Sequence, residues 1–289
     1  MLEDVDFTDG REINELDNAL HDWVDQYDLK QLSTNFVLAA DEANIMLTEA
    51  PEVTDSELQQ AMRWKLKANS EINIKDSVID CISIPGQRER GRQAMAYVVT
   101  ASTDLLKSYV RIVEKSQLNL KSIDINALAL RNIAHLLPED KYGVAFLQLD
   151  PNSGLLSLSR EGSLFLARDI DVGYQQIVSM GSSKNTSLKI EDSVGMQASL
   201  ENIVLEVQRS LDYYERYFAQ TPIQTLVLAP LPAEVPGVVE YISGQLGVNV
   251  YELDLNNILT MKNRKLERGL QTKYLPAIGA ALRFSYTGT

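Results

Sequence analysis

Residues 144–170 read VAFLQL, DPNSG, LLSLS, REGS and LFLARDI, and this alternation of apolar runs with turn residues decides the fold class of the chain. Each apolar run has the length of a strand, and the segments 150–154 and 160–163 contain residues that tight turns prefer. The pattern predicts a three-stranded meander. Residues 138–143 (PEDKYG), directly before it, combine Pro, charges and Gly, and they predict a boundary between two halves of the chain.

Helices and further strands are predicted on both sides of this meander. Apolar residues recur every three or four positions over 12–27 and over 197–219, as in amphipathic helices. Thr54 and Glu57 have the spacing of a capping box that opens another helix. Further strands are predicted over 35–40, 43–48, 76–84, 93–101, 121–125, 225–228 and 248–251, and further helices from 103, over 126–137, over 237–246 and over 274–284. We therefore predict an α/β protein with mixed sheets.

The composition is that of a globular protein and excludes several functions. The 289 residues are 45% hydrophobic and carry 27 Lys and Arg against 40 Asp and Glu, a formal charge of −13. Such a chain repels phosphate backbones, so we expect no nucleic-acid binding; the basic stretches 88–92 and 262–265 are short. No apolar run approaches the ~18–20 residues of a membrane span, and residues 1–6 (MLEDVD) are acidic where a signal peptide is basic. We expect a soluble, cytoplasmic protein.

Common catalytic motifs are missing from the sequence. It has no Walker phosphate loop, dinucleotide fingerprint, paired-cysteine motif, zinc-protease motif or nucleophile elbow. His21 and His135 lie far apart, each within a helical pattern and without a neighbouring nucleophile. The single cysteine, Cys81, is expected to be a buried thiol in a strand. We assign no catalytic residue and no metal site.

One segment has the chemistry of phosphate binding. The turn 150–154 offers small residues whose backbone N–H groups can approach a phosphate, and the carboxylate of Asp150 can hold Mg²⁺ through water. Asp150, Asn152 and Ser153 are therefore candidate cofactor-binding residues. The same five residues are also what an ordinary turn prefers, and local evidence favours that simpler interpretation.

Four further segments carry a resemblance to a known family. In chain order they are SELQQAMRWK (56–65), IDINALAL (123–130), EVQRSLDYY (206–214) and LPAIGAALR (275–283). With these segments the chain resembles the PilM-like family of type IV pilus biogenesis proteins, and within it most closely the members that serve MSHA pili.

The resemblance implies an actin-like fold, similar to that of the cell-division protein FtsA. Two ribonuclease-H-like lobes would then make up the chain, with a subdomain inserted into the first. The first lobe is predicted over 1–43 and 118–142, the inserted subdomain over 44–117, and the second lobe over 143–289, with its last helix returning to the hinge. The opening strands of the first lobe have no counterpart in this sequence.

Actin-like ATPases grip nucleotide with three loops, and this sequence departs from all three. Asp9-Gly10 comes too late to be the first loop. The second loop corresponds to Asp150 but has Asn152 in place of Gly, and the third corresponds to 228–232 (LAPLP), whose prolines have no N–H. We predict no cofactor and no ATP turnover. The alternative is a nucleotide-binding ATPase that holds ATP and Mg²⁺ at the Asp150 loop.

The resemblance also implies a partner. In the family, a groove between the first lobe and the inserted subdomain takes the short cytoplasmic N-terminal segment of a single-span inner-membrane protein, here one resembling MshJ or PilN. An acidic groove would attract a basic juxtamembrane peptide. Arg63 and Trp64 are the candidate contacts, and a core position for Trp64 is the alternative. The predicted function is a cytoplasmic scaffold of the pilus assembly platform, held at the inner membrane through this partner, with the assembly ATPase as a second candidate partner.

Overall fold

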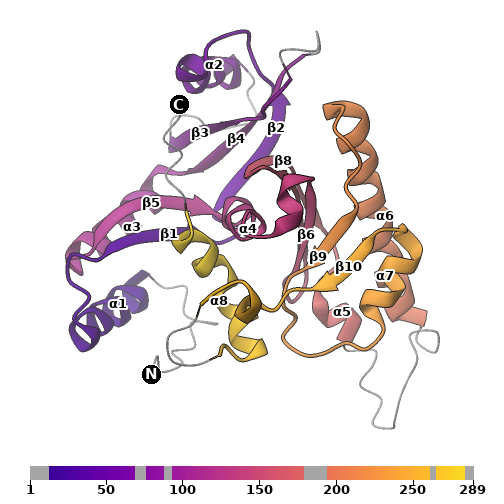
Figure 1. The fold of residues 1–289 in the computed structure, drawn as a ribbon. Coiled ribbons are helices and arrows are strands. Elements are labelled where there is room, and N and C mark those ends of the chain that lie inside the picture. The colour runs from indigo at the N-terminus through magenta and orange to yellow at the C-terminus, as the bar shows by residue number, and fades with distance from the viewer. Residues whose placement is uncertain (1–12, 69–75, 88–92, 179–193, 261–264, 284–289) are drawn as a thin grey trace. The chain divides into compact units, whose positions relative to one another are not determined.

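The chain forms two compact units, residues 1–126 and 127–289. A computed structural model describes residues 13–68, 76–87, 93–178, 194–260 and 265–283 (Figure 1). The sequence features Asp9-Gly10 and the basic stretch 88–92 lie outside these residues. The predicted lobes divide after residue 142, whereas the two compact units divide after residue 126. The assignment of lobes and insert stays a prediction.

In the first unit, β1 (Ser33–Leu38) and β5 (Asn119–Ile125) pair in parallel. They were predicted as strands, but the parallel partner of β1 lies more than 80 residues away and local patterns do not reveal it. The helices α1 (Ile13–Tyr27) and α3 (Thr103–Lys115) pack against each other. Phe36 of β1 contacts Tyr109 of α3 with ring centroids 4.3 Å apart, and the Tyr109 hydroxyl donates to Glu42.

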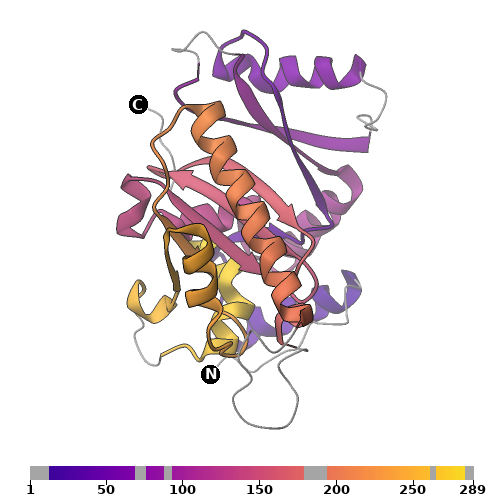
Figure 2. The ribbon, with the colours of Figure 1, turned by 90° about the vertical axis from the view of Figure 1, so that its right-hand side faces the viewer.

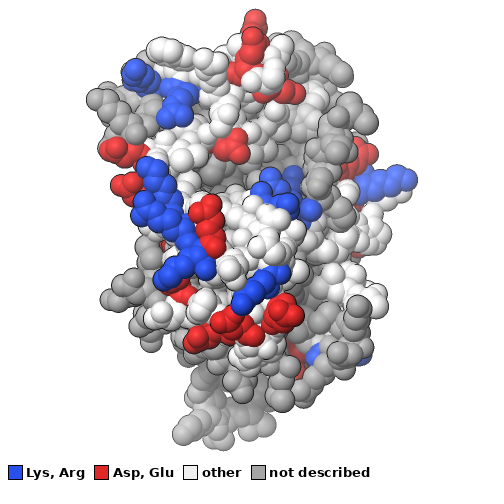
Figure 3. Space-filling model, turned by 90° about the vertical axis from the view of Figure 1, so that its left-hand side faces the viewer, with Lys and Arg blue, Asp and Glu red and all other residues white. Residues whose placement is uncertain are grey.

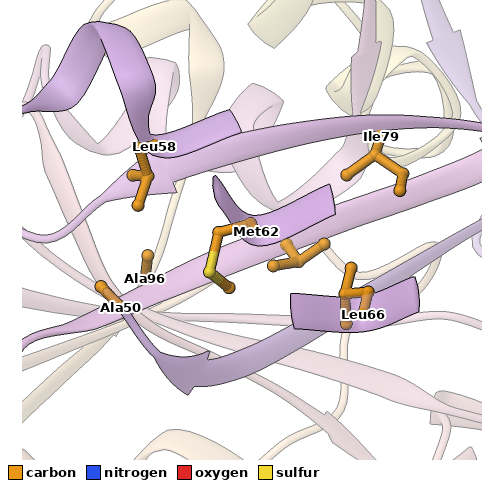
Figure 4. Packing of buried hydrophobic residues seen from close by; sticks show 7 residues of the cluster. Ala50, Leu58, Met62, Leu66, Ile79 and Ala96 are labelled. Carbon is orange, nitrogen blue, oxygen red and sulfur yellow. The ribbon is translucent and has the colours of Figure 1, made fainter. Parts of the chain in front are cut away.

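The first unit also contains a second sheet, which forms the body of the predicted insert. The strands β2 (Ala43–Glu49), β4 (Met95–Ser102) and β3 (Ser77–Ser83) pair antiparallel in the order β2-β4-β3. The helix α2 (Asp55–Ala68) covers one face of this sheet. Its apolar stripe packs on the strands, as Figure 4 shows, because residues four apart share one side of a helix. The cluster comprises Ala50, Leu58, Met62, Leu66, Ile79, Ala96 and Val98.

The predicted capping box opens α2. The Thr54 N–H donates to Glu57 Oε2 at 3.1 Å, and the Glu57 N–H donates to the Thr54 carbonyl at 3.0 Å. These bonds satisfy groups that the first turn of a helix leaves unpaired. The pKa of Glu57 is lowered by the Thr54 hydroxyl and backbone N–H. The start of α2 at residue 55 is therefore encoded locally.

The second unit is built on one mixed sheet in the order β10-β9-β6-β7-β8. The predicted meander is confirmed as β6 (Val144–Leu149), β7 (Gly154–Arg160) and β8 (Ser163–Ile170), and β9 (Thr225–Leu228) and β10 (Asn249–Glu252) extend the sheet in parallel. The long helix α6 (Val194–Phe218) lies across one face of the sheet, next to α7 (Val238–Leu246) (Figure 2). The short helix α5 (Tyr174–Val178) packs against α6.

Two helices, α4 (Asn126–Ala134) and α8 (Arg268–Ala281), touch each other on the other side of this sheet (Figure 1). Asn132 Nδ2 donates to the Gly279 carbonyl at 2.9 Å. A Cβ at Gly279 would lie 2.2 Å from the Ala129 carbonyl oxygen, so only glycine allows this approach. The helix predicted over 126–137 ends at 134, and a 3₁₀ turn, η3 (Pro138–Lys141), follows. The last helix begins six residues before the predicted start and contains Pro276.

Candidate functional site

The sequence-predicted contacts Arg63 and Trp64 lie on the solvent side of α2. Trp64 is 65% exposed, so the alternative of a core position is wrong. Helical geometry explains this, because Leu58, Met62 and Leu66 form the buried stripe and position 64 lies on the opposite side. The Lys67 ammonium lies 5.4 Å from the centroid of the Trp64 ring. The exposure of both residues supports their role as partner contacts, which stays a prediction.

The other face of the β2-β4-β3 sheet is the second candidate surface, and the sequence did not point to it. Paired strands place on that face the side chains of Ile45, Leu47, Val78, Ile82, Tyr97 and Val99. Tyr97 is buried, Val78 is 44% exposed, and the other four are partly exposed. We call this set the open face. The signal in the sequence was that β4 is apolar at nearly every position, which indicates apolar neighbours on both sides of a strand.

Two acidic residues accompany the open face. The strand alternation places Glu49 of β2 and Asp80 of β3 on the same side of the sheet as Ile45 and Val99, and both acids are exposed. Acidic side chains that could attract a basic peptide therefore accompany the open face, whereas the surroundings of Arg63 and Trp64 on α2 are basic; an acidic peptide-binding surface stays a prediction. The C-terminal half of α2 is basic, with Arg63, Lys65 and Lys67.

The candidate phosphate turn, residues 150–154, links β6 to β7. The Asp150 N–H donates to the Ser153 carbonyl at 2.8 Å, and Gln148 Nε2 donates to Asp150 Oδ1 at 2.8 Å. Burial raises the pKa of Asp150, and the hydrogen bond from Gln148 opposes that shift. Asn152 and Ser153 are exposed. The structure thus brings the three predicted residues together in one turn, with the carboxylate already bonded inside the protein.

A neighbouring segment closes over this turn. The N–H groups of Tyr174 and Gln175 donate to the carbonyls of Asp150 and Pro151 at 2.9 and 3.1 Å. A Cβ on Gly173 would lie 2.4 Å from three backbone atoms of residues 150–152, so no larger residue fits there. The turn is therefore packed against its own unit through backbone atoms. Sequence reasoning missed Gly173 because its partner is 20 residues away.

The segment 228–232, which corresponds to the adenosine loop, has its backbone donors engaged. The Ala229 N–H donates to the Leu147 carbonyl at 2.8 Å, and the Leu231 N–H donates to Glu252 Oε1 at 3.0 Å. Pro230 and Pro232 have no N–H. Arg268 forms an ion pair with the same Glu252 carboxylate. Residues 229–232 therefore keep no backbone N–H for a ligand, which is the donor that such a loop normally supplies.

The remaining chemistry-bearing side chains have structural surroundings. His135 Nδ1 lies 2.7 Å from Asp140 Oδ2, and the buried Asp140 also accepts the Gly162 N–H at 2.7 Å. These bonds tie the end of α4 to the β7–β8 turn. Cys81 is half-buried, and burial together with the nearby Asp80 carboxylate raises the pKa of its thiol to about 11. Within the described residues, no three His, Cys, Asp or Glu side chains converge as a metal site.

No helix within the described part of the chain is long and apolar enough to cross a lipid bilayer. The described sheets and helices make up a two-unit α/β protein. The family model for the type IV pilus assembly protein PilM matches residues 5–285 of the chain. The chain belongs to the PilM family. A comparison with curated proteins gave no match.

Solved structures show what the fold of this chain is similar to. A chain of a PilM–PilN type IV pilus biogenesis complex is similar over 94% of this chain and 84% of its own length, with 17% identity and a TM-score of 0.67. This likeness confirms the predicted actin-like fold. The cytoplasmic domain of EpsL, an inner-membrane component of the type II secretion system of Vibrio cholerae, has 14% identity, coverage of 93% and 81%, and a TM-score of 0.46. A Bacteroides thetaiotaomicron protein with an actin-like ATPase fold has 10% identity, coverage of 92% and 80%, and a TM-score of 0.43.

Proposed function

We propose that this protein is a non-catalytic, cytoplasmic scaffold of a type IV pilus assembly platform. It binds the cytoplasmic N-terminal segment of a single-span inner-membrane protein that resembles PilN. The observation that carries the proposal is the match of the PilM family model over residues 5–285. The machine is of the MSHA type, with this chain as its MshI-like member and a partner resembling MshJ. The four sequence motifs support this finer assignment.

The open face is the surface that best suits the partner segment. A row of partly exposed apolar side chains on one face of a sheet offers area that a partner segment can cover. Ile45, Leu47 and Val99 offer apolar area, and Glu49 and Asp80 offer charge for the basic residues that precede a membrane span. Arg63 and Trp64 then lie on the opposite side of the subdomain, as a separate candidate contact.

A peptide titration tests the scaffold. The full chain is titrated into a labelled peptide with the cytoplasmic N-terminal sequence of the membrane protein encoded beside it, and fluorescence anisotropy is recorded. Val78→Lys places a positive charge on the open face at a position that is 44% exposed, where the charge repels a basic peptide and the fold tolerates it. We expect the Kd to rise about tenfold, which corresponds to ~1.4 kcal/mol. Leu205→Lys is the matched control, because Leu205 is 47% exposed on α6.

The two variants separate the outcomes. Equal affinity of Val78→Lys and the unchanged chain would remove the open face from the proposal, and Trp64→Ala and Arg63→Ala would then be measured in the same assay. If the folded chain binds none of the N-terminal peptides of the pilus membrane proteins, the scaffold proposal is wrong.

The second candidate function, nucleotide binding at the Asp150 turn, is tested by thermal unfolding with Mg·ATP. A ligand at 100 times its Kd stabilises a protein by about 2.7 kcal/mol. We expect no change in Tm, because the carbonyls of the turn and the N–H groups of residues 229 and 231 are engaged within the protein. A rise in Tm that Asp150→Ala abolishes would establish the alternative.

A further inference from the structure

The C-terminal half of α2 carries a basic and aromatic surface that the proposed peptide site does not use. Arg63, Trp64, Lys65 and Lys67 form it, and we call it the basic face. No acidic residue occurs between Leu58 and Lys67. At the top of Figure 3, where α2 lies, basic and acidic side chains form two separate groups. The acidic residues of α2 itself lie in its first turn, Asp55 and Glu57.

Within the described residues, the cations of the basic face form no ion pair. Lys65 Nζ donates to the Glu49 carbonyl at 2.7 Å, which keeps its charge beside the helix, and Lys67 lies over the Trp64 ring. In the part of the chain that the structure describes, no carboxylate lies within ion-pair distance of Arg63, Lys65 or Lys67. The helix dipole places about half of one negative charge at the C-terminal end of α2. This is small compared with the three positive charges of Arg63, Lys65 and Lys67.

Trp64 makes this surface more than a solvated row of bases. Single exposed apolar residues are ordinary. The large apolar residues exposed within the described part of the chain are Leu32, Trp64, Val78, Tyr142 and Leu205. Among these, Trp64 alone has three basic residues within three positions. An indole next to Lys and Arg is the combination that lies at the boundary between lipid headgroups and acyl chains.

We propose that the basic face of α2 binds the anionic headgroups of a membrane surface, with Trp64 inserting at the headgroup level and Arg63, Lys65 and Lys67 contacting phosphates. The proposal rests on the proposed function only for the nearness of a membrane. The charge of −13 does not oppose it, because the Debye length is about 8 Å at physiological ionic strength. Asp55 lies eight residues from Arg63, which corresponds to about 12 Å along a helix.

An acidic protein segment is the other class of partner that such a surface attracts. The lipid surface is favoured because the described cations form a diffuse group around an exposed indole on a convex helix. Arg63 and Lys65 flank Trp64 in the chain, and such a surface suits a plane better than a narrow peptide.

Vesicle sedimentation without any peptide tests the proposal independently of the scaffold function. The full chain is spun down with vesicles of phosphatidylcholine alone or mixed with phosphatidylglycerol. We expect pelleting only with phosphatidylglycerol, and release in ~1 M NaCl, where the Debye length is about 3 Å. Each basic residue near an anionic surface contributes roughly fivefold to binding. Arg63→Glu, Lys65→Glu and Lys67→Glu together should therefore reduce binding by at least about 100-fold.

A matched pair of variants controls for general charge and for folding. Trp64→Ala with Lys67→Ala removes one exposed aromatic and one cation, and should weaken vesicle binding at least about fivefold. Lys141→Ala with Tyr142→Ala removes the same two groups elsewhere, where the ammonium lies 5.6 Å from the centroid of a ring that is 67% exposed. This control should bind vesicles like the unchanged chain. Circular dichroism confirms that each variant is folded.

The outcomes decide the proposal. Loss of vesicle binding in both α2 variants, with the control unchanged, supports it. It is overturned if the folded chain ignores phosphatidylglycerol vesicles, if the two pairs of variants bind equally, or if only polyglutamate binds the basic face. Failure here with normal peptide binding would leave the scaffold function standing.

Discussion

At the scale of single residues, the close packing of Gly173 against the Asp150 turn predicts that a side chain at position 173 destabilises the protein. Gly173→Ala would place a Cβ 2.4 Å from backbone atoms of residues 150–152, which cannot move without breaking the β6–β7 turn. We expect a loss of about 3 kcal/mol of unfolding free energy, measured by urea denaturation. Gly244→Ala is the control, because no atom lies within 4 Å of its Cβ and the site is helical. That variant should gain about 0.5–1 kcal/mol. Equal stabilities would contradict the packing described for the turn.

The raised pKa of the Cys81 thiol predicts that this thiol reacts more slowly in the folded protein than in the unfolded protein. Burial and the Asp80 carboxylate raise the pKa of Cys81 from 9.0 to about 11. At pH 8 the thiolate fraction is then about 100-fold lower than in the unfolded chain. Alkylation by iodoacetamide should slow by a similar factor in the native state relative to urea. Because the folded pKa is the higher one, the unfolded state ionises first, and stability should fall as pH rises from 9 towards 11. Equal alkylation rates would disprove the shift.

At the scale of elements, α2 and its sheet form the part of the molecule on which both proposed contacts depend. Met62 is fully buried at the centre of their shared core. Met62→Ala should cost about 2–5 kcal/mol of unfolding free energy. In urea it should release α2 early and weaken peptide and vesicle binding together. Leu205→Ala, at an exposed position of α6, should cost little. If Met62→Ala leaves both binding activities unchanged near the midpoint of its unfolding, the two contacts do not lie on this subdomain.

How much of these elements the sequence predicts depends on where their partners lie. The start of α2 is set by Thr54 and Glu57 within one turn, and the β6–β7–β8 meander is set by turns of four or five residues, so both were predicted closely. The parallel pairing of β1 with β5 joins distant segments and has no local signal. The end of α4 was misplaced for the same reason. Asn132 near this end bonds to Gly279 of α8, and the chain beyond residue 134 leads into η3, so the surroundings of this helix end come from other elements.

The candidate site follows the same rule. That Asp150, Asn152 and Ser153 share one turn was evident from the sequence, since they are neighbours in the chain. The contacts that engage this turn come from Gly173 and Tyr174, and those that engage residues 229–232 come from Leu147 and Glu252. The open face was missed because a face exists only after three strands are paired in register. Trp64 was found by the family motif, while its exposure needed the orientation of α2.

At the scale of the whole molecule, the net charge does not reveal that acidic and basic residues lie on different sides of α2 and its sheet. This separation connects the two proposals. The chain is acidic overall, but Glu49 and Asp80 lie with the open face of the β2-β4-β3 sheet, whereas Arg63, Lys65 and Lys67 belong to α2, which covers the other face. A membrane-anchored basic peptide and an anionic lipid surface are therefore complementary to different sides of one small body. Each contact alone is modest, because exposed charges are screened by salt.

If α2 binds the lipid surface while the open face binds the partner peptide, we expect avidity that depends on the length of the peptide between its membrane anchor and its binding segment. A peptide that leaves the membrane under α2 and reaches the open face must pass a helix about 10 Å across and the sheet behind it, about 20 Å in all, which needs roughly six extended residues. We expect vesicles that carry phosphatidylglycerol and the lipid-anchored partner peptide to bind the chain about 100-fold more tightly than either component alone. Trimming the spacer between anchor and binding segment to two residues should abolish this gain while leaving the affinity of the free peptide unchanged. Val78→Lys and the triple charge reversal on α2 should each reduce binding to that of the remaining contact. If the short spacer performs as well as the long one, the two contacts do not lie on opposite faces of the subdomain.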